Sequence, residues 1–226
     1  MNCGTDCSTC ECLQSFSCSY ESGILISDPY AACSTPIREC NTHCSCSDLC
    51  SNRVVQHGIK VRLQIFKTTS KGFGVKSLQS ISKGQFVCEY AGEILKPDTA
   101  KQRFQYQDAN GIDNYIHVLN EHCSNGKVIS TYIDPRLCGN VGRFINHSCE
   151  PNLFMVPVRI DHVVPRLALF ALRDIAADEE LSYNYSGDLS SSKPNSADEE
   201  TNAKKCFCGS KKCAGVLPVD QSLISK

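Results

Sequence analysis

Cysteine is the residue type in this sequence whose spacing most clearly indicates chemistry. Of the 17 cysteines in 226 residues, ten lie between Cys3 and Cys50 and three between Cys206 and Cys213. Tight C-x-C and C-x3-C steps, with no secretory signal pattern after Met1, favour metal binding over structural disulfides. Disulfide pairing is the alternative interpretation, and the odd number of cysteines makes it less attractive.

Both cysteine groups have the composition of zinc sites. A tetrahedral zinc ion takes four ligands, so the eight closely spaced N-terminal thiols would saturate two ions, or three if some thiolates bridge. The three C-terminal cysteines leave a structural zinc one ligand short, and we expect the distant Cys149 to supply it. The predicted metal ligands are Cys3, Cys7, Cys10, Cys12, Cys40, Cys44, Cys46, Cys50, Cys149, Cys206, Cys208 and Cys213.

Two tyrosines late in the central region form a second candidate site. If the alternating segment 180–185 is a strand, Tyr183 and Tyr185 point to the same side, because strand side chains alternate with period two. Both hydroxyls could then face one channel. The alternative is that they are two core tyrosines on a buried face.

The elements that must position these residues are predicted to be short strands with little helix. Val61, Leu63 and Ile65 alternate with polar residues, which predicts a half-buried strand over 60–66. Ser-Asn-Gly at 124–126 predicts a hairpin turn. The best helix candidate is 99–107, and further strands are predicted over 86–90, 115–119, 128–133, 167–172 and 180–185.

The string NHSCEPN at 146–152 is the most specific signal in the chain. A lone histidine is often a satisfied loop residue, but the whole string resembles the Asn-His-Ser-Cys motif of SET-domain protein-lysine methyltransferases. KGFG at 71–74, FVCEYAGE at 86–93 and EELSYNY at 179–185 are similar to further family motifs in family order. The similarity runs from Cys3 to about Pro218 and falls in the suppressor-of-variegation group.

This resemblance implies a mainly β fold, the SET-domain fold of several small sheets with a threaded, pseudoknot-like C-terminal segment. It also implies zinc-bound modules on both sides. We expect a pre-SET zinc-cluster module over 1–57, the SET catalytic domain over 58–186, a flexible polar linker over 187–202, a post-SET zinc module over 203–219 and a tail over 220–226.

The resemblance further implies about four zinc ions, three in the pre-SET module and one in the post-SET module. Nine cysteines hold the three pre-SET ions in the family, and this chain offers eight, with Met1 where the first should stand. Truncation before Met1 is the favoured explanation; Cys18 or Cys33 as a substitute, or an incomplete cluster, are the alternatives.

Roles for individual residues also follow from the resemblance. Tyr185 would be the catalytic tyrosine, Tyr90 would line the lysine channel, and Tyr183 would govern how many methyl groups are added. The family usually has aspartate where Asn184 stands, and Asn184 keeps an acceptor oxygen. The residues expected to hold S-adenosylmethionine are Lys71, Gly72, Phe73, Tyr115, Arg143, Asn146 and His147.

The predicted function is therefore histone-lysine N-methyltransferase, acting in the nucleus on the histone H3 tail or nucleosomes of the chromosome. The fourth or thirty-sixth lysine, with a mono- or dimethyl product, is favoured. The alternatives are the ninth lysine, a non-histone lysine, or a catalytically weak tail-binding module. A net charge of -1 does not indicate direct DNA binding, and the longest apolar runs are too short for a membrane span.

Overall fold

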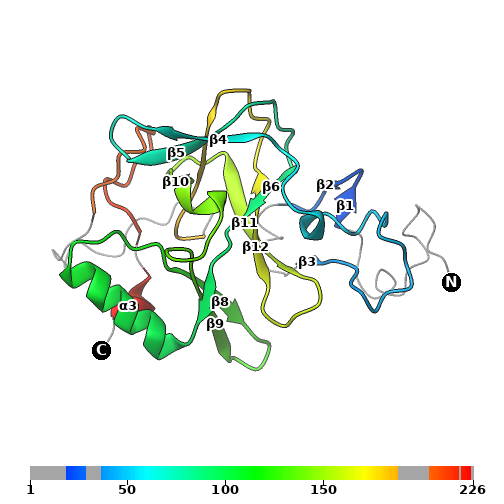
Figure 1. Cartoon of the computed structure of the whole chain (residues 1–226), viewed down its shortest axis with the longest axis horizontal. Helices are drawn as coiled ribbons and strands as arrows, with labels where there is room; N and C mark the ends of the chain where they lie inside the picture. The colour runs from blue at the N-terminus through cyan, green and yellow to red at the C-terminus, as the bar shows by residue number, and fades with distance from the viewer. Residues whose placement is uncertain (1–18, 29–36, 188–203, 219, 225–226) are drawn as a thin grey trace.

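The computed structural model describes residues 19–28, 37–187, 204–218 and 220–224, which form a mainly β protein (Figure 1). Its elements in chain order are β1 (Tyr20–Glu21), β2 (Ile24–Leu25), β3 (Ile37–Arg38), η2 (Val55–His57), β4 (Leu63–Lys67), β5 (Phe73–Ser77), β6 (Phe86–Glu89), β7 (Glu93–Leu95), α3 (Pro97–Ala109), β8 (His117–His122), β9 (Val128–Asp134), η3 (Val141–Phe144), β10 (Asn146–His147), β11 (Leu153–Arg159), β12 (Arg166–Ala171), β13 (Glu180–Tyr183) and α4 (Gln221–Ile224). Among the described residues, no helix has the length and apolar character needed to cross a membrane.

The sheet with strand order β3-β11-β12-β6 lies at the centre of the molecule (Figure 1). Leu153 and Leu169 belong to one apolar cluster, whereas their neighbours Phe154 and Phe170 belong to another. Successive residues of β11 and β12 therefore enter different cores. Because both faces of these strands are buried, their sequences are apolar apart from Arg159 and Arg166 at the strand ends, and they do not alternate.

A second sheet, with strand order β10-β13-β5-β4, carries four of the ten residues expected in the active site, namely Phe73, Asn146, His147 and Tyr183. Strand β13 pairs in parallel with β10, so that His147 lies opposite Tyr183. The Asn152 side chain accepts a hydrogen bond of 2.8 Å from the backbone N–H of Ser182 and donates one of 2.8 Å to the carbonyl of Glu180. Segments 146–152 and 180–185 are thus held side by side, as expected for a C-terminal segment inserted beside the NHSC string.

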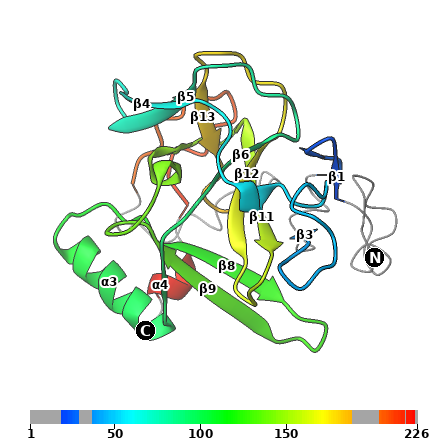
Figure 2. The same cartoon turned by 45° about the vertical axis from the view of Figure 1, so that its right-hand side comes forward.

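The third sheet, β7-β9-β8, packs against the two helices (Figure 2). Pro97 stands in the first turn of α3, where its fixed φ and missing N–H suit helix initiation. Leu223 of α4 is buried with Ala100 of α3 and Tyr132 of β9. The end of the chain therefore completes a small core between α3 and this sheet.

Several predicted elements are confirmed, and one burial pattern is wrong. The turn at 124–126 joins β8 to β9, with the N–H of Gly126 donating to the carbonyl of Cys123 over 3.0 Å. The helix extends two residues beyond each end of the predicted range, 99–107. Ile65 was expected on the buried face of its strand, but it is 43% exposed because β4 is the edge strand of its sheet.

Strand β11 is the largest element that the sequence did not predict. Pro157 interrupts it and removes a backbone donor, which argues against a strand that is bonded on both sides. In the structure β3 is only two residues long and pairs with Val158 and Arg159, so no β3 residue pairs with Pro157. The proline is tolerated because that neighbour is short.

Candidate active site

Three tyrosines from distant parts of the chain form an aromatic cluster. Tyr90 follows β6, Tyr183 ends β13, and Tyr185 lies two residues further on. Ring centroids are 6.1 Å apart for Tyr90 and Tyr183, and 4.9 Å apart for Tyr183 and Tyr185. The two tyrosines predicted to share one side do lie together. His117 of β8, which the sequence did not single out, contributes a ring 5.8 Å from that of Tyr90.

The hydroxyls of this cluster stay protonated, and main-chain carbonyls orient those of Tyr90 and Tyr185. Tyr90 donates to the carbonyl of Tyr115 over 2.5 Å, and Tyr185 donates to the carbonyl of Ile145 over 3.0 Å. Burial, followed by the neighbouring tyrosines, raises the pKa values of Tyr90, Tyr183 and Tyr185 well above the ordinary value. A hydroxyl that has given its hydrogen to a carbonyl presents lone pairs elsewhere, so these oxygens can accept a further hydrogen bond.

His147 joins the aromatic cluster to a group of thiols. Its Nδ1 accepts a 3.2 Å hydrogen bond from the backbone N–H of Tyr185, and its Nε2 lies 3.3 Å from the Sγ of Cys149. Burial lowers the pKa of His147 to about 4, so the ring is neutral at pH 7. Both ring nitrogens are engaged within the protein, so a ligand can reach only the ring edge or the main chain of this residue.

The predicted C-terminal metal ligands come together as a four-thiol cluster. The Sγ atoms of Cys149, Cys206, Cys208 and Cys213 all lie within 4.8 Å of one another. Zinc–sulfur bonds of about 2.3 Å in a tetrahedron require sulfur atoms about 3.8 Å apart, which this spacing can reach with small movements. Burial alone would raise the pKa of Cys208, but hydrogen bonds from the backbone of Cys149 and from Ser210 lower it to about 6. The cluster fits a structural zinc ion.

The described part of the N-terminal group also forms a thiol cluster. Cys40, Cys44 and Cys46 have their Sγ atoms within 4.8 Å of one another, and the Sγ of Cys50 lies 3.7 Å from that of Cys40. Burial opposes the Cys46 thiolate, but Arg53, whose Nη2 is 3.5 Å away, lowers the Cys46 pKa through a hydrogen bond and its charge. This set also suits zinc. The other predicted ligands, Cys3, Cys7, Cys10 and Cys12, lie outside the described residues.

The predicted cofactor residues of the 71–74 loop meet Asn146 through a glutamate. The Nζ of Lys71 lies 2.8 Å from both carboxylate oxygens of Glu180. The Nδ2 of Asn146 donates to Glu180 Oε1 and to the carbonyl of Phe73, each over 3.0 Å. The sequence did not assign Glu180 to the site, although it lies in the matched EELSYNY string, because this contact depends on the pairing of β13 with β5.

Two glycines allow the loop to approach these side chains closely. Gly72 has φ +72°, a conformation that residues with a Cβ rarely adopt. At Gly74, an added Cβ would come within 2.8 Å of Thr68 and 3.1 Å of Asn146 Nδ2. A larger residue at either position would therefore displace the loop.

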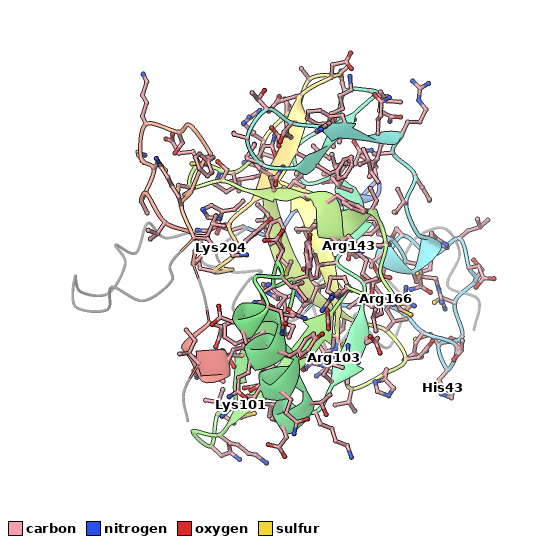
Figure 3. All side chains as sticks on the ribbon, turned by 60° about the vertical axis from the view of Figure 1, so that its left-hand side comes forward. His43, Lys101, Arg103, Arg143, Arg166 and Lys204 are labelled. Carbon is pink, nitrogen blue, oxygen red and sulfur yellow. The ribbon has the colours of Figure 1, made fainter. Side chains whose placement is uncertain are left out.

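Arg143 and Tyr115, also predicted to hold the cofactor, form a neighbouring stack (Figure 3 labels Arg143). The guanidinium of Arg143 lies 4.7 Å from the Tyr115 ring centroid and 5.1 Å from that of Phe144. Its Nε is buried and has no hydrogen-bond partner within the described part of the chain. Phe73 connects this stack to the loop, with its ring 6.2 Å from that of Phe144, and Phe73 is 57% exposed. A buried donor and an exposed aromatic ring are features that a bound polar ligand with a planar ring would complete.

Asn184, the one departure from the family pattern noted in the sequence, acts as an acceptor. Its Oδ1 receives hydrogen bonds from the backbone N–H and the hydroxyl of Ser186, at 3.1 and 3.0 Å. The acceptor oxygen expected of this residue is therefore used, in the turn directly after Tyr185.

Comparisons with known proteins identify relatives across nearly the whole chain. A family model described as the SET domain matches residues 72–186. The histone-lysine N-methyltransferase SETMAR of Bos taurus is 48% identical over 221 residues, covering 95% of this chain and 72% of the relative. The crystal structure of the methyltransferase domain of human SETMAR has a TM-score of 0.81 at 46% identity, covering 94% of this chain and 77% of that one.

Two plant proteins widen the comparison. The H3 lysine-9 specific histone-lysine N-methyltransferase SUVH5 of Arabidopsis thaliana is 42% identical over 186 residues, covering 80% of this chain and 22% of the relative. The crystal structure of Arabidopsis thaliana SUVH6 in complex with SAM has a TM-score of 0.74 at 34% identity, covering 92% of this chain and 43% of that one.

Proposed function

Because the chain belongs to the SET-domain family of S-adenosylmethionine-dependent histone-lysine N-methyltransferases, we propose that it methylates a lysine of the histone H3 tail in a channel lined by Tyr90, Tyr183 and Tyr185. The observation that carries this proposal is the three-tyrosine cluster, held by carbonyls and by His147 beside Asn146. The sequence resemblance implies these roles, with Tyr90 lining the lysine channel and Tyr185 as the catalytic tyrosine.

The chemistry that the channel residues would perform is desolvation and orientation. A free lysine amine has a pKa of about 10.4, and a dry aromatic channel disfavours the charged form, so the nucleophilic neutral amine becomes accessible. Tyr185 and Tyr90 each have their hydrogen directed to a carbonyl, so their oxygens can accept hydrogen bonds from the substrate nitrogen. Aromatic faces also tolerate the methylated cation that is formed.

The methyl donor S-adenosylmethionine, when bound, supplies an electrophilic methyl group on a sulfonium. We propose that the loop Lys71, Gly72 and Phe73, together with Asn146 and the main chain of His147, forms one side of its site. Arg143 and Tyr115 would form the other, since the buried Nε of Arg143 could then find an acceptor. Holding donor and amine in line is the main task, because a well-oriented displacement needs no enzyme nucleophile.

The metal content we propose is one zinc ion on the C-terminal thiols and up to three on the N-terminal cysteines. All ligands are thiolates, so the zinc would be structural and would not touch the reacting atoms. For the domain boundaries, we place the start of the catalytic domain at residue 58, ahead of the matched range 72–186, because β4 pairs with β5 in the site sheet.

For the target we favour the fourth or thirty-sixth lysine of histone H3, with a mono- or dimethyl product, which is also the target favoured from the sequence. The ninth lysine is the second candidate, because SUVH5, which is named as specific for that lysine, is 42% identical to this chain. Either target implies action on chromatin in the nucleus.

The decisive experiment incubates the protein with recombinant nucleosomes and labelled S-adenosylmethionine, and then maps the modified lysine by mass spectrometry. Tyr185→Phe serves as the inactive control. Label on one lysine of H3 supports the proposal and identifies the target. Label only on non-histone proteins in a parallel nuclear extract would reject the histone tail as substrate, and no transfer in either assay would reject the proposed activity.

A further inference from the structure

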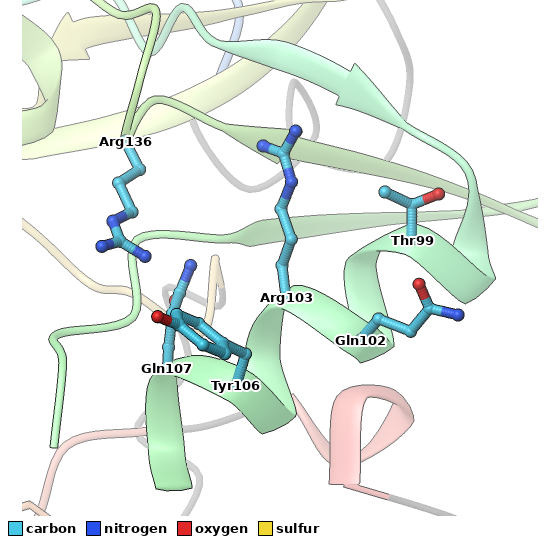
Figure 4. A pocket seen from close by; sticks show the side chains of 6 residues that line it. All are labelled: Thr99, Gln102, Arg103, Tyr106, Gln107 and Arg136. Carbon is cyan, nitrogen blue, oxygen red and sulfur yellow. The ribbon is translucent and has the colours of Figure 1, made fainter. Parts of the chain in front are cut away.

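We propose that a cavity of about 190 Å³ on α3 is a binding site for a short aliphatic carboxylate, separate from the methyl-transfer site (Figure 4). Neither the channel tyrosines Tyr90, Tyr183 and Tyr185 nor the predicted cofactor residues line it. The residues that do are Thr99, Gln102, Arg103, Tyr106, Gln107 and Arg136.

The cavity is formed by the polar face of α3. Its five helical residues follow the spacing i, i+3, i+4, i+7 and i+8, which places them on one side of a helix. The other side carries Ala100 and Phe104, which pack with Leu223 of α4. A polar helix face normally lies open to water, yet Gln107 on this face is only 1% exposed.

Gln107 is the feature that indicates a ligand. Neither its Nε2 nor its Oε1 has a hydrogen-bond partner among the residues that the structure describes. A buried amide without partners is unfavourable, and such groups in native proteins are usually satisfied by a protein group, an ordered water or a ligand. In Figure 4 the amide of Gln107 and the guanidinium of Arg136 extend toward one another across the cavity.

The charges around the cavity indicate which chemical group a ligand would need. Arg103 is already neutralised, with its Nη1 2.8 Å from Glu93 and 2.9 Å from Asp134. The half-buried guanidinium of Arg136 has no hydrogen bond or ion pair with any residue in the described ranges. The unused groups are therefore the cationic fork of Arg136, the Nε2 donor of Gln107 and the Oε1 acceptor of the same amide. A planar anion with two oxygens matches the two donors, since arginine pairs with carboxylates in a bidentate manner.

The cavity has room for a small ligand, since its volume of about 190 Å³ is several times the roughly 30 Å³ that a water molecule takes in the liquid. A free dicarboxylate such as glutarate, or the acidic side chain of a bound polypeptide, would fit this chemistry.

The test follows the side-chain amide signal of Gln107 by NMR in the full ¹⁵N-labelled chain. Titrations use glutarate, a capped peptide with one glutamate, the uncharged isostere glutaramide, and sodium chloride at matched ionic strength. We expect a saturable shift with glutarate or the peptide and binding of glutaramide at least about tenfold weaker, as loss of a charge-assisted hydrogen bond implies. Tighter binding of the peptide than of glutarate identifies a polypeptide as the source, and the reverse order identifies a free carboxylate.

Variants separate a built site from a general charge effect. Arg136→Gln should weaken binding about tenfold or more, whereas Arg62→Gln, which removes an exposed arginine outside the cavity, should not change it. Gln107→Leu should melt at a higher temperature than the unliganded wild type and lose the rise in melting temperature that glutarate causes. A Gln107 signal that responds equally to glutarate and sodium chloride, equal binding by Arg136→Gln, or a lower melting temperature of Gln107→Leu would each overturn the proposal.

Discussion

The two thiol clusters contain the same kind of ligand but are attached to different parts of the molecule. The C-terminal cluster reaches the aromatic channel in two steps, from Cys149 to His147 and from His147 to the backbone of Tyr185. The N-terminal cluster has no such connection among the described residues. It is joined to the central sheet, where the N–H of Glu39 donates to the carbonyl of Arg159 on β11.

A buried carboxylate fastens the N-terminal cluster to the sheet. Glu39 is 4% exposed, and its Oε1 accepts hydrogen bonds from the hydroxyl of Tyr20 at 2.9 Å and from the N–H of Val55 at 2.7 Å. Its Oε2 accepts from the Nε2 of Gln56 at 2.9 Å, and Gln56 also donates to the carbonyl of Cys40. We infer that one cluster acts on the geometry of catalysis and the other on the stability of the fold.

The largest expected effect follows from removing a ligand of the C-terminal cluster. Cys206→Ser should lower methyl transfer by about 100-fold or more while most of the core stays folded, because a displacement of about 1 Å at the channel is enough for such a loss. Turnover with labelled S-adenosylmethionine measures methyl transfer, and the near-ultraviolet circular dichroism spectrum measures whether the core stays folded. Cys138→Ser, an exposed cysteine outside both clusters, is the matched control. Full activity in a Cys206→Ser protein that has lost its zinc would show that the C-terminal cluster does not control the geometry of catalysis.

The equivalent change in the N-terminal cluster should mainly lower the stability of the fold and leave methyl transfer almost unchanged. Cys50→Ser should lower the free energy of unfolding by about 3 kcal/mol or more, a fall in melting temperature of at least about 6 °C, because metal binding contributes to folding. The turnover of the folded protein at low temperature should change by less than about twofold. Thermal melts and elemental analysis test this, and a large loss of turnover without loss of stability would show that this cluster also acts on the channel.

Glu39→Gln tests the attachment of that cluster without touching a thiol. The neutral amide cannot accept all the hydrogen bonds that the carboxylate receives, and a buried donor left unpaired is costly, so the free energy of unfolding should fall by about 2 kcal/mol. Urea denaturation measures it, with the exposed Asp108→Asn as a control that should change little. Equal effects in the two variants would show that Glu39 does not attach the N-terminal cluster to the central sheet.

The smallest expected effect concerns the number of methyl groups and leaves both clusters intact. We propose that the hydroxyl of Tyr183 holds a water where a further methyl would stand, so Tyr183→Phe should move the product toward trimethyl-lysine. One hydrogen bond is worth roughly 0.5 to 1.5 kcal/mol, which corresponds to at most about a tenfold change in product ratio. Mass spectrometry of a peptide methylated to completion gives the ratio. An unchanged distribution would mean that Tyr183 does not set it.

Local sequence patterns predicted those features of the thiol cluster and the tyrosine cluster that depend on residues close together in the chain. The spacing of Cys206, Cys208 and Cys213 predicted three members of the four-thiol cluster, and the period of two placed Tyr183 beside Tyr185. Three thiols leave a zinc ion one ligand short, and Cys149 in the NHSC string was chosen as the fourth.

What the sequence did not predict depends on contacts between distant segments. Glu180 meets Lys71 and Asn146 only once β13 lies between β5 and β10, and this register is not encoded within any short window. Strand β11 was hidden by Pro157, whose cost vanishes only because β3 is short. Likewise, a buried Glu39 is unfavourable until the donors of Tyr20, Val54, Val55 and Gln56 surround it.

Comparison of wild type with Tyr185→Phe tests the central claim most directly. Calorimetry measures the affinity for S-adenosylmethionine, and turnover is measured on nucleosomes in the same preparation. The tyrosine hydroxyl is proposed to act on the reacting amine, so affinity for the methyl donor should stay within about twofold while turnover falls by about 100-fold or more. Unchanged turnover in Tyr185→Phe, at wild-type affinity, would contradict the account.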